Sequence, residues 1–334
     1  MGAKRRYHAA MTFFAILLAL LVEQARPLGF DNPVHAGLRS WARWARRSLD
    51  TGQAHQGAIA WAVAVLVPAA LAALVYWLLW QLSVLLAFVW TVVVLYHTVG
   101  FRQFSHHFTE IRDALEAGDE AAARQALARW RRVEVSQIAR DELLRHAIEH
   151  SVLAAHRHVF GVLVWFLVLA LLGLGPAGAV LYRLAEYLSR NWQARPDGTP
   201  SAHLQRAAAT AWRWVDHVPV RVTALAFAVV GNFEDAVASW RQDAARFPNP
   251  NDGVVLAATA GAINVRLGGR ALGEPLPLPG PDVASATPPD AAASISTDGR
   301  EPQLAHLGSV VGLVWRSVVM WMLLLALLTL ARLP

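Results

Sequence analysis

The stretch from Ala58 to Tyr96 is apolar throughout, apart from Gln81 and Ser83. It is about twice as long as the roughly 20 residues that one α-helix needs to cross a bilayer. Two crossings fit this length and one does not. The sequence therefore predicts a tight hairpin of two membrane helices, over residues 58–80 and 82–99, with Pro68 as a kink in the first.

Further apolar stretches predict additional contact with lipid. Residues 11–28 follow a basic N-terminus and are expected to form an embedded first segment. Residues 159–181 contain a Gly/Pro-rich break, so either a kinked span or a re-entrant hairpin fits. Residues 218–231 are too few for a crossing, and a span is expected near the C-terminus. With 55% hydrophobic and 16% charged residues, the chain is predicted to be all-α. It is expected to be a multi-span helical integral membrane protein with about four or five apolar membrane segments, some re-entrant, and with cytoplasmic helices.

Breaks in composition divide the chain into consecutive regions. The N-terminal membrane region is expected over residues 1–99, and a cytoplasmic helical region over 100–158. Residues 159–267 combine a membrane segment, a polar region and the short apolar segment. Residues 268–303 are rich in Pro, Ala, Gly and Ser and read as a linker, and residues 304–334 carry the last span.

Positive charge is carried almost wholly by arginine, and Lys4 is the only lysine. The arginines concentrate in residues 23–56 and 100–158, which two predicted spans separate and which therefore lie on the same side of the membrane. The positive-inside rule makes that side the cytoplasm. The expected location is the bacterial inner membrane, with lipid as a partner. Nucleic acid is not expected, because no recognition motif accompanies the net charge of +6.

Two histidine motifs are candidates for chemistry. His146, Glu149 and His150 match H-x-x-E-H, a pattern in which two histidines one turn apart bind zinc. We interpret them as a polar helix face, because no third ligand is identifiable, and we assign no metal site. His156-Arg157-His158 precedes an apolar block and is interpreted as an interfacial anchor, with contact to an anionic ligand as the alternative. On these residues alone, the function stays open.

Several motifs occur in an order typical of a known family. They are Asn32-Pro33-Val34 with Arg39, Arg140-Asp141, Val218-Pro219-Val220-Arg221-Val222, and a long run from Trp240-Arg241-Gln242-Asp243 through Asn251 to Leu267-Gly268-Gly269. In this the chain resembles, nearly end to end, the CobD/CbiB family of cobalamin-biosynthesis membrane proteins. The first segment, with Met11 and Glu23, is more similar to the related AmpE family.

The resemblance implies an adenosylcobinamide-phosphate synthase-like function, in which an aminopropanol unit is attached to an adenosylated corrinoid by amide formation. It also implies Mg²⁺ and a nucleotide for phosphoryl activation. The ligand contacts that it implies here are Arg140, Arg221, Trp240, Arg241, Asp243 and Asn251. The arginines would hold phosphate or carboxylate, and Asp243 would orient an arginine or a cation.

The chain departs from the family's pattern at acidic motifs. Leu153, Ala154 and Arg157 stand in the family's E-N-x-x-D-G segment, and Glu186 begins its N-T-x-D-S-M segment. Asp216 stands in place of an asparagine. Two other functions are therefore kept open, namely a non-catalytic AmpE-like membrane sensor or regulatory protein, and an unrelated transporter or protease.

Overall fold

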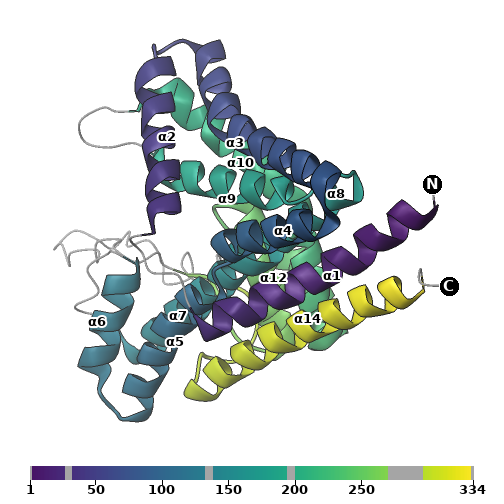
Figure 1. Ribbon diagram of the computed structural model, residues 1–334. Coiled ribbons are helices and arrows are strands. Elements are labelled where there is room, and N and C mark those ends of the chain that lie inside the picture. Colours follow the sequence, from purple (N-terminus) through teal and green to yellow (C-terminus); the bar gives the residue numbers. More distant parts are fainter. Residues whose placement is uncertain (1, 27–31, 132–137, 194–199, 270–295, 332–334) are drawn as a thin grey trace. The chain divides into compact units, whose positions relative to one another are not determined.

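The structure is a computed structural model that describes residues 2–26, 32–131, 138–193, 200–269 and 296–331. Helices account for nearly all of the described residues (Figure 1). In chain order they are α1 (Gly2–Ala25), α2 (Pro33–Leu49), α3 (Ala54–Leu82), α4 (Val84–Thr98), α5 (Phe101–Glu116), α6 (Glu120–Arg131), α7 (Arg140–Ala155), η1 (His156–Phe160), α8 (Gly161–Leu171), α9 (Ala177–Asn191), α10 (Ala202–Val230), α11 (Phe233–Asp243), η2 (Ala244–Arg246), α12 (Pro250–Ile263) and α14 (Leu304–Leu330).

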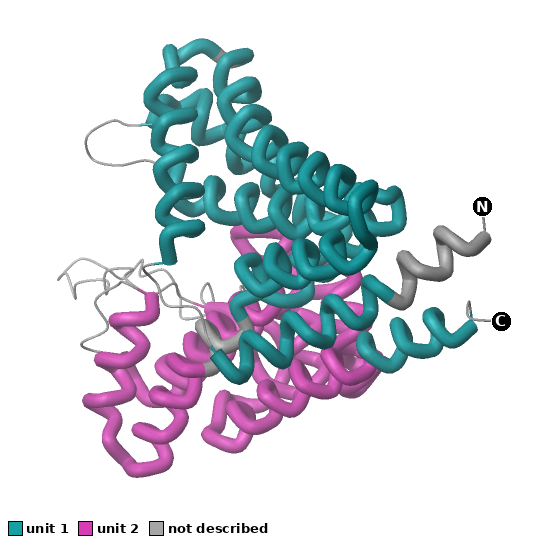
Figure 2. Tube along the Cα trace, in the orientation of Figure 1, with its two compact units in different colours: residues 1–102, 157–219, 321–334 teal, residues 103–156, 220–320 magenta. Residues whose placement is uncertain are grey.

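The chain folds into two compact units, each built from separated stretches of sequence (Figure 2). Unit 1 comprises Met1–Arg102, Arg157–Pro219 and Trp321–Pro334, and unit 2 comprises Gln103–His156 and Val220–Met320. This grouping differs from the consecutive regions expected from composition, because the region 159–267 is divided at Pro219. Most of the expected linker, residues 270–295, lies outside the described residues.

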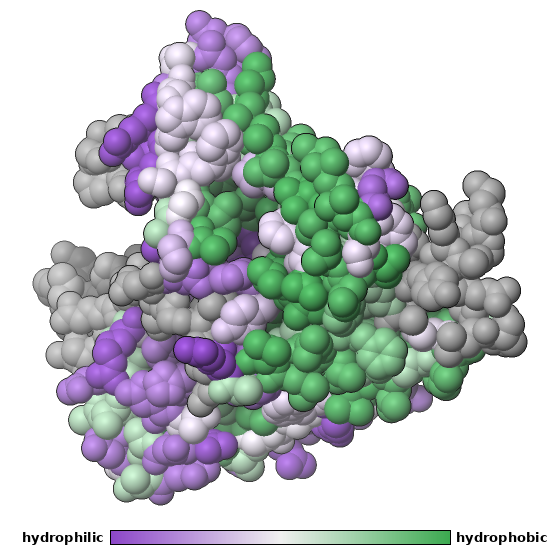
Figure 3. All heavy atoms as spheres, viewed as in Figure 1, coloured by the Kyte–Doolittle hydropathy of each residue, from purple (hydrophilic) through white to green (hydrophobic). Residues whose placement is uncertain are grey.

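The prediction of an all-α membrane protein is confirmed. Among the described residues, three helices have the length and composition to cross a membrane, namely His55–Leu82, Arg140–Leu171 and Leu304–Leu330. Met11–Ala25 and Val84–Thr98 are shorter apolar helices. Hydrophobic side chains gather over α3 and α4 (Figure 3). The exposed large ones on α3 include Leu66, Val67, Leu71, Leu74, Trp77 and Leu78. Exposed apolar surface of this extent is the kind that lipid covers.

The predicted membrane hairpin is formed by α3 and α4, which pack against each other. The turn falls at Ser83, whose backbone is extended. Its hydroxyl accepts a hydrogen bond from the Leu85 amide at 3.2 Å, which satisfies one of the free donors at the start of α4.

The apolar stretch 159–181 is divided between two helices, and the chain reverses between them. Its first part continues from α7 through a π-helical turn, η1, into α8, and the chain then reverses into α9. Gly173 and Gly175, with φ of 81° and 55°, make the reversal. Helices α8 and α9 pack closely, because a Cβ on Gly178 would stand 1.9 Å from the Trp165 carbonyl oxygen. The chain thus forms a helical hairpin here, and its depth in the membrane stays a prediction.

Residues 218–231, expected as a separate short apolar segment, instead form the last part of the long helix α10. Pro219 lies inside this helix and lacks an N–H, so the carbonyl of Val215, four residues earlier, loses its helical donor. The indole N–H of Trp165 donates to that carbonyl at 2.8 Å. The helix therefore continues through the proline, because a neighbouring side chain supplies the missing hydrogen bond.

The same arrangement occurs in α3. Pro68 lies inside this helix, and the carbonyl that it deprives of a donor belongs to Ala64. The indole N–H of Trp41 on α2 donates to this carbonyl at 3.2 Å. Trp41 thus ties α2 to α3 at the point where α3 would otherwise be weakest.

We expect W165F to lower the free energy of unfolding by about 1–3 kcal/mol, because the Val215 carbonyl loses its donor. In the P219A background the same substitution should cost less, since the backbone amide that alanine restores then makes the helical hydrogen bond. Denaturant unfolding of the four proteins in detergent, analysed as a double-mutant cycle, measures this coupling. An equal cost in both backgrounds would show that the tryptophan contributes only packing.

Candidate functional site

Four of the six predicted ligand contacts lie at a helical corner of unit 2. Trp240 and Arg241 are on α11, Asp243 ends it, and Asn251 is the second residue of α12. Helices α11 and α12 pack closely, because Gly261 brings its backbone against Asp235, and a Cβ there would lie 2.2 Å from the Asp235 carbonyl oxygen. We call the segment from Trp240 to Asn251 the α11–α12 corner.

Within the α11–α12 corner, Asp243 is 2% exposed. It accepts a hydrogen bond from the Ser239 hydroxyl at 2.9 Å and forms an ion pair with Arg246 at 3.1 Å. Asn249 caps α12 by accepting from the Asn251 amide at 3.1 Å. Asn251 itself is buried. Asp243 and Asn251 are thus the buried polar residues of this turn, whereas Trp240 is half-buried and Arg241 is exposed.

The other two predicted residues lie elsewhere in unit 2. Arg140 begins α7, is about half exposed, and forms an ion pair with Glu120 of α6 at 3.6 Å. Arg221 is a half-buried residue of α10. Arg140 therefore joins α6 to α7. Trp240 and Arg241 stay candidates for contact with a ligand.

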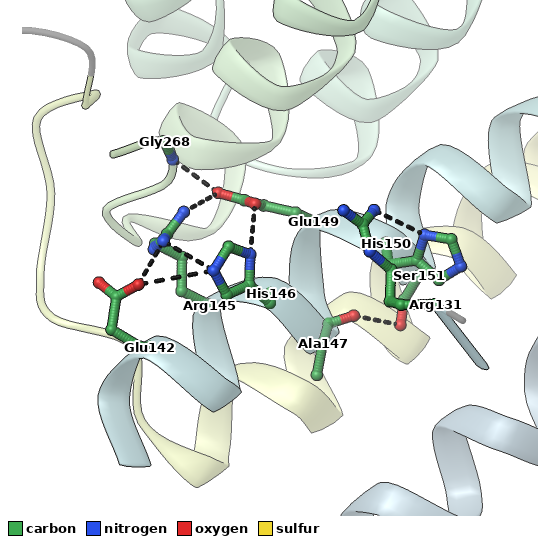
Figure 4. Close-up of polar contacts among 9 residues, drawn as sticks. All are labelled: Arg131, Glu142, Arg145, His146, Ala147, Glu149, His150, Ser151 and Gly268. Carbon is green, nitrogen blue, oxygen red and sulfur yellow. Dashed lines mark hydrogen bonds and ion pairs between the residues drawn. The ribbon is translucent and has the colours of Figure 1, made fainter. Parts of the chain in front are cut away.

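A polar cluster on α7 is absent from the sequence-based site (Figure 4). Arg145 is 5% exposed and pairs with Glu142 and, at 3.0 Å, with Glu149. The His146 ring contacts Glu142 at 3.5 Å and Glu149 at 3.4 Å. These residues follow i, i+3, i+4, i+7 spacing, so they share one helix face. We call them, with Gly268, the Arg145 cluster.

Gly268 joins the Arg145 cluster to the end of α12. Its amide donates to Glu149 at 2.7 Å, across 119 positions of sequence. Gly268 and Gly269 have φ of 92° and 106°, a conformation that favours glycine. Leu267 is held in turn by Thr297, whose hydroxyl accepts from the Leu267 amide at 2.9 Å. The Leu-Gly-Gly motif therefore places the backbone N–H of Gly268 within hydrogen-bonding distance of the partly buried Glu149 carboxylate.

Both carboxylates of the Arg145 cluster have their charge offset by neighbouring donors. Glu142 pairs with Arg145 and contacts His146, and Glu149 accepts hydrogen bonds from Arg145 at 3.0 Å and from the Gly268 amide at 2.7 Å.

The H-x-x-E-H pattern does not form a zinc site in this arrangement. His146 faces Glu142 and Glu149, whereas His150 lies 3.4 Å from Arg131 (Figure 4). The His150 ring also packs edge-on against Trp130. Within the part of the chain that the structure describes, no three His, Asp or Glu side chains converge as metal ligands do. His146 is buried on α7, whereas Glu149 and His150 are partly exposed, and the absence of a metal site stays a prediction.

A second buried network, in unit 1, gathers positions where the chain departs from the family's pattern. Tyr182 and Asp216 are both 0% exposed, and the tyrosine hydroxyl donates to Asp216 at 2.8 Å. Arg157 and Glu186 act electrostatically on the same hydroxyl. Burial raises the pKa of Tyr182 well above its usual range, and Asp216 raises it further. The hydroxyl therefore stays protonated as a donor.

Sequence reasoning missed both buried networks. The sequence does contain a signal for the Arg145 cluster, because the charged residues of α7 recur at helical spacing in a segment that leads into an apolar block. The second links residues of η1, α9 and α10, and no spacing in the sequence brings these together.

Comparisons with known proteins identify the family. A family model described as "CobD/Cbib protein" matches residues 12–295. The chain belongs to the CobD/CbiB family. It is 32% identical to the Cobalamin biosynthesis protein CobD of Stutzerimonas stutzeri over 94% of this chain and 96% of that protein. It is 36% identical to the protein of the same name from Chromobacterium violaceum, over 62% and 63% of the two chains. No solved structure matches it.

Membership in the CobD/CbiB family confirms the resemblance predicted from the motifs and with it the assignment to cobalamin biosynthesis. The motifs, from Asn32 to Gly269, span most of the matched residues. The additional likeness to the AmpE family is not supported by these matches and stays a prediction.

Proposed function

We propose that this protein acts in cobalamin assembly at the bacterial inner membrane, where it attaches an aminopropanol unit to an adenosylated corrinoid. The supporting observation is its 32% identity, over nearly the full length of both chains, to a relative named Cobalamin biosynthesis protein CobD. In the reaction the amine nitrogen attacks the carboxyl carbon of a corrinoid side chain, an amide forms and the carboxyl oxygen leaves. Because a free carboxylate is a poor acyl donor, the oxygen must first be activated by phosphoryl transfer.

The α11–α12 corner is our candidate for the ligand contacts. Trp240 offers a flat apolar face, and the exposed guanidinium of Arg241 suits a carboxylate or phosphate. Asp243 is already bound to Ser239 and Arg246, so its role is to position Arg246 rather than to touch the ligand. Arg221 and Asn251 remain proposed contacts, and Arg140 is the least favoured because it joins α6 to α7.

The carboxylates of Glu142, Glu149 and Asp243 do not fit the Mg²⁺ that the resemblance implies. Glu142 and Glu149 are taken up by Arg145 and His146, and Asp243 is paired with Arg246. A Mg²⁺ site normally combines one or two available carboxylates with substrate phosphate and water. No step of the proposal therefore runs through a protein-held metal.

Complementation tests the proposed function. A strain that lacks the aminopropanol-attaching enzyme should grow on cobyric acid when it expresses the wild-type chain. W240A and R241Q should reduce cobalamin yield by about tenfold or more, the loss expected for one strong ligand contact. Q242A is the matched control, because Gln242 is an exposed neighbour on the same helix, and it should leave the yield unchanged.

Cobinamide, which already carries the aminopropanol, should support growth of every strain and shows that later steps are intact. Absence of growth on cobyric acid, with the wild-type chain present in the membrane fraction, would contradict the proposal. It would favour the non-catalytic AmpE-like alternative.

A further inference from the structure

A cavity of about 210 Å³ lies between α2 and α9 in unit 1. Its position follows from small residues on α2, where Ala42 and Ala45 are buried in a core cluster with Leu188 and Trp192. Helices α2 and α9 both pack against α3, and the longer side chains of α2 stand at the edge of the gap between them. The cavity is lined by Ala42, Arg43, Arg46, Tyr187, Asn191 and Trp192.

Arg43 and Arg46 are one helical turn apart and line the same cavity. Arg43 donates one N–H to the Ser40 hydroxyl at 3.1 Å, which leaves its other donors for a ligand. Arg46 has no side-chain hydrogen bond or ion pair within the described ranges. Two guanidinium groups therefore present donors to one small space.

The carboxylates next to the cavity in sequence are already occupied. Glu186, which precedes Tyr187, pairs with Arg190 at 2.5 Å and with Arg183 at 3.4 Å. Asp50, at the end of α2, accepts a hydrogen bond from the Ser201 amide at 2.8 Å. Neither is within ion-pair distance of Arg43 or Arg46 in the described structure, so the charge of the two guanidinium groups is not balanced locally.

We propose that the α2–α9 cavity binds the phosphate group of a compact ligand. Guanidinium groups bind phosphate through paired N–H donors, and two on one helix face can hold one such group from two sides. The cavity is smaller than the roughly 300–1,000 Å³ typical of sites for drug-sized ligands. The ring of Trp192 and that of Tyr187 give it an apolar wall for a short carbon chain. A free phosphomonoester and a phospholipid head group share this chemistry. The proposal does not depend on the proposed function.

The first test removes charge at the cavity. In phosphatidylcholine nanodiscs, R43Q/R46Q should raise the Kd for glycerol phosphate or inorganic phosphate by about tenfold or more, because charge-assisted hydrogen bonds are lost. The control R39Q/R47Q removes the same charge from the same helix, at residues that do not line the cavity. It should change the Kd less than about twofold. Equal weakening in both variants would overturn the proposal, because it would indicate attraction to the whole helix.

The second test needs no variant. Phenylglyoxal modifies accessible arginines, and mass spectrometry of the wild-type protein should show that glycerol phosphate protects Arg43 and Arg46 but not Arg39 and Arg47. Protection in phosphatidylcholine nanodiscs would identify a soluble phosphomonoester as the ligand. Protection only in phosphatidylglycerol nanodiscs would identify a lipid head group. Both outcomes support the site, and reaction of Arg43 and Arg46 at unchanged rates under all conditions would overturn it.

Discussion

R145M is expected to lower the free energy of unfolding by about 3–5 kcal/mol, the usual cost of removing one partner of a buried ion pair. Arg145 is 5% exposed, and its guanidinium holds Glu142 and Glu149 on one side of α7. Methionine fills a similar volume but leaves a carboxylate in the interior without its cation. Denaturant unfolding in detergent, followed by circular dichroism, measures the loss.

The matched control is R140M on the same helix. Arg140 is about half exposed and its ion pair with Glu120 is 3.6 Å long, so this substitution should change stability by less than about 0.5 kcal/mol. The double variant R145M/E149Q should be more stable than R145M, since glutamine still accepts from the Gly268 amide and carries no charge. If R145M were no less stable than R140M, the Arg145 cluster would not stabilise the fold.

G178A is the second substitution with a large expected effect, a loss of about 3 kcal/mol or more through overpacking. A Cβ at this position would lie 1.9 Å from the Trp165 carbonyl oxygen and 2.4 Å from its carbon. These are main-chain atoms of α8, and the Trp165 side chain is tied to Val215 as well. Neither helix can therefore yield locally, and α8 and α9 must separate.

A melting curve in detergent measures this effect, and G37A is the control. Gly37 is also a helical glycine, but a Cβ there meets nothing within 4 Å. G37A should stabilise the protein by about 0.5–1 kcal/mol, because alanine restricts the unfolded chain and favours helix. Equal melting temperatures for G178A and G37A would mean that α8 and α9 are not in the close contact described.

The limits of prediction from sequence are clearest in α10. The sequence predicts a short apolar segment over residues 218–231 and no long helix that runs through Pro219. The helix continues because Trp165, 50 positions away, donates to the carbonyl that the proline deprives of its partner. Local propensity does not reveal such a distant donor, so the sequence by itself does not predict one helix over Ala202–Val230.

The candidate site shows the same limit. Motifs located the α11–α12 corner, where Trp240, Arg241, Asp243 and Asn251 lie together. They did not reveal that Asp243 is held by Ser239 and Arg246, nor that Arg140 joins two helices. The Arg140–Glu120 pair depends on the approach of α6 and α7, which residue types alone do not specify. Ser239 and Arg246 lie at helical spacing from Asp243, but spacing alone does not show that this aspartate is buried.

From sequence alone it follows that this is a helical membrane protein of the CobD/CbiB kind, because the length of an apolar run is set against bilayer thickness and the motifs persist along the chain. Only the tertiary structure decided which charges are buried and what neutralises them. Glu149 meets Arg145 one turn away and Gly268 in the segment that follows α12. The physical reason is that burying a charge is tolerated only where packing supplies its partners, and one of these partners lies 119 positions away in the sequence.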